Sequence, residues 1–353
     1  MNKTTKLWAI LIAAILLLAA FACGKQAEKP AEPTAEPVAE QPVEEPAAEP
    51  AEEPAAEPAE EPAAEPAAEP EPDTAVTVVD MMGHEVTLKK PAERIVALTA
   101  SDCEIVYALG AGDLLVGRGE YCDYPAEVLE KPVVKSGAET NLEEILALEP
   151  DVVIMATMAQ TVDQVNALEA AGVKVIVSDA QNLEGVYTAI TLIGDVVGKP
   201  EEAAALVTEM QDTFADIKAK AENTGKTVYF EVSPLQWGLW AAGKGTFMDE
   251  LAEICGLTNA FAEVDGWAEV SEEQVLAKNP DYIVTTSMYW GEGPTPVEEI
   301  LGRAGWDQLK AVQNNQIFNA DSNAITRPGP RLMDAVKALF DFVYGTAEEE
   351  PAA

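Results

Sequence analysis

Hydrophobic and polar residues follow regular patterns from residue 75 onward. Two short alternating runs within residues 75–88, with turn-forming residues between them, predict a β-hairpin. Short apolar runs at 94–98, 114–117 and 173–179 then alternate with segments of helical period. This alternation predicts a parallel sheet whose strands are joined by right-handed helical crossovers.

The next segment, 183–223, has almost no strand pattern. Its helical period predicts two helices, and the second, at 201–222, would be roughly 30 Å long. A second series of strands and helices follows and ends in a predicted helix at 331–344. We therefore predict an α/β fold with an N-terminal lobe at 75–182 and a C-terminal lobe at 224–345, joined through the long helix.

One αβ unit occurs twice in the chain. The sequence NLEEILALEPDVVI at 141–154 returns without a gap as SEEQVLAKNPDYIV at 271–284. Each copy predicts a short helix that ends at a Pro-Asp pair and leads into an apolar strand. Each helix is predicted to begin with a capping box, formed by Asn141 with Glu144 and by Ser271 with Gln274.

The repeat aligns two acidic residues, Glu143 and Glu273, in the first helical turn of each copy. Both side chains are predicted to point away from the apolar face. A carboxylate there also stabilises the helix dipole, which alone explains an acid at each position. Two similar lobes with an acid at the same place nevertheless suggest a symmetric partner that contacts both.

The first 23 residues predict a secretion signal. Lys3 and Lys6 precede an apolar run at 7–22, which is shorter than the roughly 20 residues of a membrane-spanning helix. Cys23 follows directly, and this arrangement resembles the signal of a bacterial lipoprotein, with Cys23 as the lipidated residue. The alternative is ordinary secretion with cleavage near residue 22.

Residues 24–73 consist almost entirely of Pro, Ala and Glu in a repeating pattern. Such a segment has no apolar surface to bury, so residues 24–74 are predicted to form an extended, disordered stalk. The acidic tail at 346–353 is also predicted to be disordered. The net charge of the whole chain is −40, and the predicted lobes remain strongly acidic without the stalk. This charge argues against nucleic acid or an anionic membrane surface as a partner.

Histidine and cysteine offer little for catalysis or metal binding. The single histidine, His84, lies in the predicted hairpin turn, so neither a zinc site nor a Ser-His-Asp triad is expected. Cys103, Cys122 and Cys255 have no CxxC spacing. They could be buried thiols or could include one disulfide, and the sequence does not select a pair.

Aromatic residues gather in segments predicted as loops after strands. In open α/β sheets such loops surround the ligand. The alternative is that each ring anchors its own loop. The candidate ligand-binding aromatics are Tyr121, Tyr124, Trp237, Trp240, Trp267 and Trp290. Arg327, in a rigid loop before the last helix, is a candidate polar ligand contact, unless it forms a salt bridge with an acidic neighbour.

Several stretches resemble one protein family. TVVDMMGHEVTLKKPAERIVAL, GEYCDYP, NLEEILALEPDVVI, WAAGKGTFMDELAEICG and TRPGPRL occur in the order found in the cobalamin and ferric-siderophore substrate-binding proteins of ABC importers. The resemblance covers about residues 75–345. It implies two Rossmann-like lobes joined by one long helix, the class III periplasmic-binding fold, with the ligand between the lobes and little hinge motion. It also implies that Glu143 and Glu273 meet arginines of a permease dimer, and that the GEYCDYP loop and Trp267 reach the cleft.

We therefore expect a lipid-anchored extracytoplasmic protein that delivers a corrinoid to an ABC permease and catalyses no reaction. The aromatic cleft favours a corrinoid, and the acidic lobes disfavour a highly charged catecholate chelate. A ferric hydroxamate siderophore or haem is the alternative ligand, and no other cofactor is expected. An alternative of another class is a surface sensor or adhesion module, for which the stalk is equally suitable.

Overall fold

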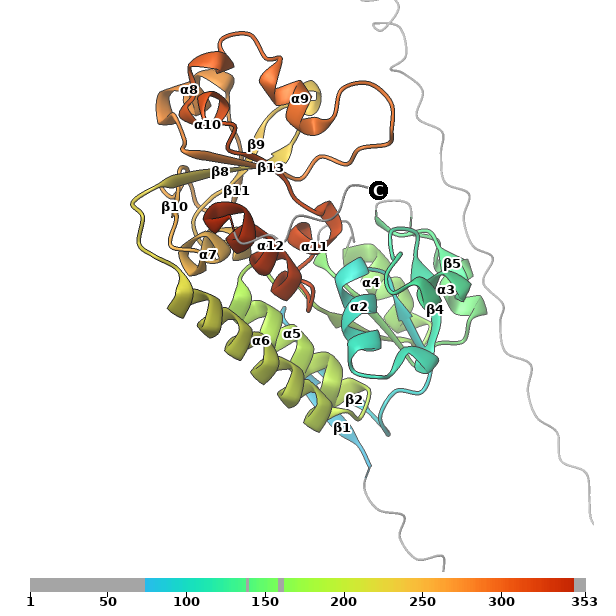
Figure 1. Ribbon diagram of the computed structural model, residues 1–353. Helices are drawn as coiled ribbons and strands as arrows, with labels where there is room; N and C mark the ends of the chain where they lie inside the picture. Colours follow the sequence, from blue (N-terminus) through green and yellow to red (C-terminus); the bar gives the residue numbers. More distant parts are fainter. Residues whose placement is uncertain (1–73, 138–139, 158–161, 346–353) are drawn as a thin grey trace, which may run out of the picture. The chain divides into compact units, whose positions relative to one another are not determined.

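The computed structural model of this chain describes residues 74–137, 140–157 and 162–345 (Figure 1). The predicted signal sequence, stalk and acidic tail lie outside the described residues. Within the described part, none of the helices combines the length and the apolar character needed to cross a lipid bilayer.

The first lobe is built on a parallel sheet with the strand order β5-β4-β3-β6-β7. Its strands are β3 (Ile95–Ala97), β4 (Leu115–Gly119), β5 (Val133–Val134), β6 (Val152–Met155) and β7 (Lys174–Val177). Its helices are α2 (Ala100–Ala108), α3 (Leu142–Ala147) and α4 (Val162–Ala170), with 3-10 turns η1 (Gly112–Leu114) and η2 (Ala126–Glu130). The predicted hairpin is confirmed, because β1 (Val76–Val79) pairs antiparallel with β2 (Glu85–Leu88).

The second lobe has a mixed sheet. Its strands are β8 (Thr227–Ser233), β9 (Trp240–Ala242), β10 (Thr258–Asn259), β11 (Trp267–Glu269), β12 (Tyr282–Thr285) and β13 (Ile317–Asn319). Four of them pair in parallel, but β9 and β11 form an antiparallel edge beside β8. The helices are α7 (Phe247–Ile254), α8 (Glu272–Lys278), α9 (Pro296–Leu301), α10 (Lys310–Gln313), α11 (Ser322–Thr326) and α12 (Leu332–Tyr344), with 3-10 turns η5 (Leu235–Trp237) and η6 (Trp306–Gln308).

Two helices connect the lobes, α5 (Leu183–Val196) and α6 (Pro200–Lys220), and lie side by side (Figure 1). Helix α5 packs against α2 and β1, whereas α6 packs against α7 and α12. Met210, Phe214 and Ile217 are buried on α6 at helical spacing, so one apolar stripe faces the protein. The fold is therefore the predicted one, with two Rossmann-like α/β lobes joined by a long helix.

The internal repeat is a structural duplication. In the first lobe, Asp151 precedes β6, and its carboxylate accepts hydrogen bonds of 2.9 Å from the backbone N–H groups of Glu93 and Arg94 before β3. In the second lobe, Asp281 precedes β12 and accepts a 3.0 Å hydrogen bond from the N–H group of Thr227 at the start of β8. The Pro-Asp pair thus joins the starts of two adjacent strands in both lobes.

The predicted capping box forms in only one of the two copies. Ser271 and Gln274 make both reciprocal hydrogen bonds at the start of α8. Asn141 caps α3 with its side chain, but Glu144 does not return a bond to Asn141. Its carboxylate instead accepts a 3.2 Å hydrogen bond from the backbone N–H group of Lys135, so the capping-box prediction for Asn141 with Glu144 is wrong.

Candidate functional site

A cleft of about 420 Å³ opens at the carboxyl ends of the first-lobe strands. Apolar surface predominates on its walls, and residues of both lobes contribute. The first lobe supplies Tyr121 after β4 and a segment after β7. The second lobe supplies Phe247, Trp267 and Arg327. Because ligands of α/β proteins bind at the carboxyl ends of parallel strands, this cleft is the candidate ligand site.

The aromatic wall of the cleft is held in place by its neighbours. The rings of Trp267 and Phe247 lie 5.3 Å apart between centroids and are tilted by 58°. The indole N–H group of Trp267 donates a 3.2 Å hydrogen bond to the side chain of Gln181, which lies just before α5. Trp267 is therefore fixed between α7 and the connecting helices and presents a flat surface of defined orientation.

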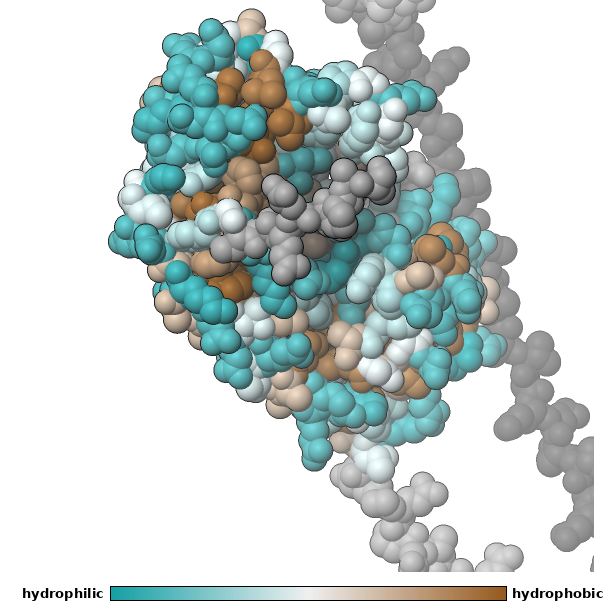
Figure 2. All heavy atoms as spheres, viewed as in Figure 1, coloured by the Kyte–Doolittle hydropathy of each residue, from teal (hydrophilic) through white to brown (hydrophobic). Residues whose placement is uncertain are grey.

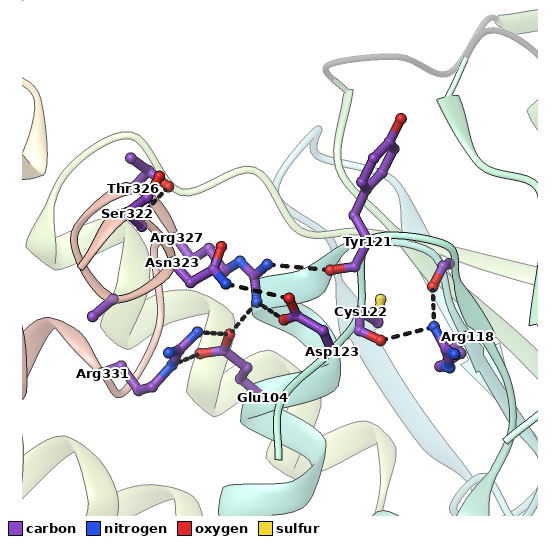
Figure 3. A network of polar contacts seen from close by, with 12 residues as sticks. Glu104, Arg118, Tyr121, Cys122, Asp123, Ser322, Asn323, Thr326, Arg327 and Arg331 are labelled. Atoms are coloured by element: carbon purple, nitrogen blue, oxygen red, sulfur yellow. Dashed lines mark hydrogen bonds and ion pairs between the residues drawn. The ribbon is translucent and has the colours of Figure 1, made fainter. Parts of the chain in front are cut away.

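Arg327 lies at the centre of a polar network that links the two lobes (Figure 3). Its Nη1 atom donates hydrogen bonds of 2.9 Å to Glu104 and 2.6 Å to Asp123, and its Nη2 atom donates one of 3.2 Å to the carbonyl oxygen of Tyr121. Glu104 also binds Arg331 through two hydrogen bonds of 2.9 and 2.6 Å. Asn323 completes the network with a 3.2 Å hydrogen bond to Asp123.

The network balances its own charge, since two carboxylates face two guanidinium groups. Burial alone would lower the pKa of Arg327, but its hydrogen bonds to Asp123 and Glu104 raise the pKa above its ordinary value. Burial would raise the pKa of Asp123, yet the hydrogen bond and charge of Arg327 outweigh burial and lower it. Arg327 thus forms the salt bridges that the alternative reading expected, and it also lines the cleft.

A buried carboxyl group lies directly behind the cleft wall. Asp102, the third residue of α2, is fully buried, and neither of its carboxylate oxygens has a hydrogen-bond partner among the described residues. Burial raises the pKa of Asp102 to about 7, although the nearby hydroxyl groups of Ser178 and Thr99 lower it in part. Thr99 and Ser178 both line the cleft, so Asp102 lies close to the site.

The structure divides the predicted aromatic set among several places. Tyr121 and Trp267 line the cleft. Trp237 and Trp290 instead line a second hollow of about 520 Å³, formed by loops of the second lobe, and are 76% and 82% exposed. Tyr124 lies beneath Arg331, whose guanidinium carbon is 4.3 Å from the centre of its ring.

The prediction that Trp240 and Trp267 lie in loops is wrong, because they belong to the strands β9 and β11. Trp240 lies at the antiparallel edge and is not part of the lining of either hollow. Sequence reasoning also missed Phe247, Gln181 and Glu104. An acid within the otherwise apolar segment CEIVYAL was an available signal for Glu104.

Glu143 and Glu273 occupy equivalent positions in the two lobes. Each is the second residue of its helix, α3 or α8, and each side chain is exposed to solvent. The hydrogen bonds of its own backbone N–H group and of Ser271 lower the pKa of Glu273, so this side chain is a carboxylate at neutral pH.

On the face seen in Figure 2, polar side chains dominate and hydrophobic ones form separate patches.

Comparison with known proteins identifies the family. Residues 95–324 match the family described as periplasmic binding protein. This chain belongs to that family. A Bacillus subtilis relative, the uncharacterised ABC transporter substrate-binding lipoprotein YvrC, is 37% identical over 277 residues, which cover 76% of this chain and 85% of the relative.

Solved structures of periplasmic binding proteins share the fold. The vitamin B12 binding protein BtuF of Vibrio cholerae is 28% identical, with a TM-score of 0.61 and coverage of 74% of this chain and 99% of that one. A possible iron-binding solute-binding protein of Staphylococcus epidermidis is 31% identical, with a TM-score of 0.61 and coverage of 72% and 100%. This chain is accordingly an extracytoplasmic binding protein and not an enzyme.

Proposed function

We propose that this periplasmic binding protein captures a corrinoid in the cleft and delivers it to an ABC permease. The observation that carries the ligand assignment is the pairing of Arg327 with Glu104 and Asp123. Among the described residues that line the cleft, Arg327 has the sole guanidinium group, and its charge is already neutralised. A ligand of many carboxylates would find no free counter-charge there.

A large apolar ring with neutral amide arms fits these walls better. Trp267, Phe247 and Tyr121 offer flat surfaces, and the Arg327 network offers polar atoms at the rim. Vitamin B12 is the ligand named for the Vibrio cholerae relative, which supports the assignment. A ferric hydroxamate or haem is the second candidate, supported by the iron-binding description of the Staphylococcus epidermidis structure.

Delivery is proposed to use Glu143 and Glu273 as contacts for the two halves of a permease dimer. Their equivalent places in the repeat and their exposure support this role. Anchoring through a lipid on Cys23 is proposed from the sequence and from the naming of the Bacillus subtilis relative as a lipoprotein.

Isothermal titration of the full chain with cyanocobalamin, haemin and ferric hydroxamates tests the ligand. We expect saturable binding of cyanocobalamin with one site per chain and weaker binding of the other two. Tight binding of haemin or a ferric hydroxamate without binding of cyanocobalamin would replace the corrinoid assignment. Binding of none of these compounds would overturn the whole ligand class.

Uptake assays test the docking role separately. Cells with the variant Glu143→Arg, Glu273→Arg or both should display the protein and bind ligand normally. The double variant should lose uptake by more than the sum of the two single effects, because both contacts act on one bound complex. Glu201→Arg, which changes an exposed first-turn acid of α6 outside the repeat, is the matched control. Normal uptake by the double variant would leave the repeat without a docking role.

A further inference from the structure

The structure brings two of the three described cysteines together. Cys103 lies on α2, and Cys122 lies in the loop after β4. Their Sγ atoms are 3.6 and 3.8 Å from the same atom, the carbonyl oxygen of Ala97 at the end of β3. Cys255 lies in the second lobe, where its Sγ atom is 3.8 Å from the carbonyl oxygen of Val336. The first two cysteines therefore lie at one carbonyl group, where the structure holds both as free thiols, and the third lies elsewhere.

We propose that Cys103 and Cys122 form an intrachain disulfide in the extracytoplasmic protein. Extracytoplasmic compartments favour disulfides. The reaction is thiol–disulfide exchange with a small-molecule or protein disulfide as the oxidant. One thiolate attacks the oxidant and releases one of its thiols. The second cysteine then loses its proton, displaces the other thiol and closes the bond, so that two thiols are oxidised and one disulfide is reduced.

The burial of Cys103 and Cys122 in the folded lobe determines at which stage of folding the disulfide forms. Both side chains are completely inaccessible to solvent. The pKa of Cys103 lies well above its ordinary value, first because the thiol shares a hydrogen bond with Cys122 and also because it is buried. The folded protein thus offers neither the thiolate nor the access that exchange requires. The disulfide forms before the loop closes onto α2, and it is protected from reductants once the lobe has folded.

The position of the pair gives the disulfide a role at the cleft. Cys103 precedes Glu104, and Cys122 lies between Tyr121 and Asp123, so the bond joins the two segments that hold Arg327 (Figure 3). A covalent link here fixes the spacing of the carboxylates of Glu104 and Asp123. The disulfide therefore acts as a positioning element for Arg327, and it does not depend on which ligand the cleft binds.

Peptide mapping tests the bond directly. The full chain is exported under oxidising conditions, alkylated in denaturant without reduction and digested with trypsin. Cleavage after residues 94, 118 and 135 places Cys103 and Cys122 on different peptides. We expect peptides 95–118 and 119–135 to be recovered as one cross-linked species that reductant separates, with Cys255 alkylated. Recovery of alkylated Cys103 and Cys122 would overturn the proposal.

Variants test the consequence. Without reductant, Cys103→Ala and Cys122→Ala should each lower the Tm by about 5–10 °C, and the double variant should lower it little further, because both remove one bond. Reductant added during unfolding and refolding should lower the Tm of the wild type and of the matched control Cys255→Ala, but not of the other variants. Equal reductant sensitivity in all variants, or in none, would contradict the disulfide.

Discussion

Replacing the buried acid Asp102 by Asn should make the protein more stable at high pH. Asp102 lies behind the cleft wall, fully buried, and its two oxygens lack hydrogen-bond partners in the described structure. Its carboxylate form therefore loses hydration that the nearby hydroxyl groups of Ser178 and Thr99 replace only in part. Asn has nearly the same shape but carries no charge at any pH, so Asp102→Asn removes the cost of ionisation and little else.

The magnitude follows from the pKa. Burial raises the pKa of Asp102 from 3.8 to about 7, and each unit corresponds to 1.36 kcal/mol, so the ionised group lowers the unfolding free energy by about 4 kcal/mol. Because the folded state holds the proton more tightly than the unfolded state, this penalty is absent below pH 4. It grows between pH 4 and pH 7 and is complete above that range.

Urea unfolding followed by circular dichroism measures the effect. The tryptophans of the described residues all lie between 237 and 306, so their fluorescence would report mainly on the second lobe. The stability gain of Asp102→Asn over wild type should increase by about 3 kcal/mol between pH 4.5 and pH 8. Asp216→Asn, on the exposed face of α6, is the control and should show no such trend. A gain for Asp102→Asn that does not change with pH would refute the reasoning.

Three further predictions concern the cleft and its network. Trp267→Ala should weaken ligand binding by about 1–3 kcal/mol in calorimetry, whereas Trp267→Phe should retain most of the affinity. Equal losses of affinity in the two variants would argue against a stacking role for Trp267. Arg327→Lys should bind ligand less tightly than wild type, because an ammonium group cannot reproduce the planar guanidinium that holds Glu104, Asp123 and the Tyr121 carbonyl group. Unchanged affinity would exclude a role of this planar group in ligand binding. Glu104→Gln should lower the unfolding free energy by about 3 kcal/mol, because two partly buried guanidinium groups lose a shared partner, and a change below about 0.5 kcal/mol would contradict this.

Sequence patterns locate the architecture because its determinants are local. The Pro-Asp pairs at 150–151 and 280–281 end a helix and begin a buried strand through backbone effects that extend over a few residues. The helical period of 183–223 is equally local, and both predictions are confirmed. Strands β9 and β11 have only three residues each, too few for a period of two to be distinguished from a loop. Trp240 and Trp267 were misplaced for this reason.

The polar network of the site depends on pairs that are far apart in the chain. Arg327 and Glu104 are separated by 223 positions, and the sequence gives each a set of plausible partners among many acids and several arginines. The same holds for Tyr124, whose ring is covered by Arg331. Which side chains meet is decided only when residues 327–331, between α11 and α12, pack beside α2. Sequence could nominate Arg327 for the cleft but could not show that its charge is already compensated.

Because Glu104 and Asp123 already neutralise Arg327, an acidic ligand can bind there by exchanging its carboxylate for that of Asp123. A ligand carboxylate that takes the place of Asp123 at Arg327 releases a group whose pKa is lowered by that same arginine against the opposing effect of burial. The released Asp123 then regains its affinity for protons, so that binding of an acidic ligand takes up protons from the buffer at mildly acidic pH. The heat of binding would vary with the ionisation enthalpy of the buffer. A neutral amide that leaves Asp123 in place causes no proton uptake, and its heat of binding is the same in every buffer.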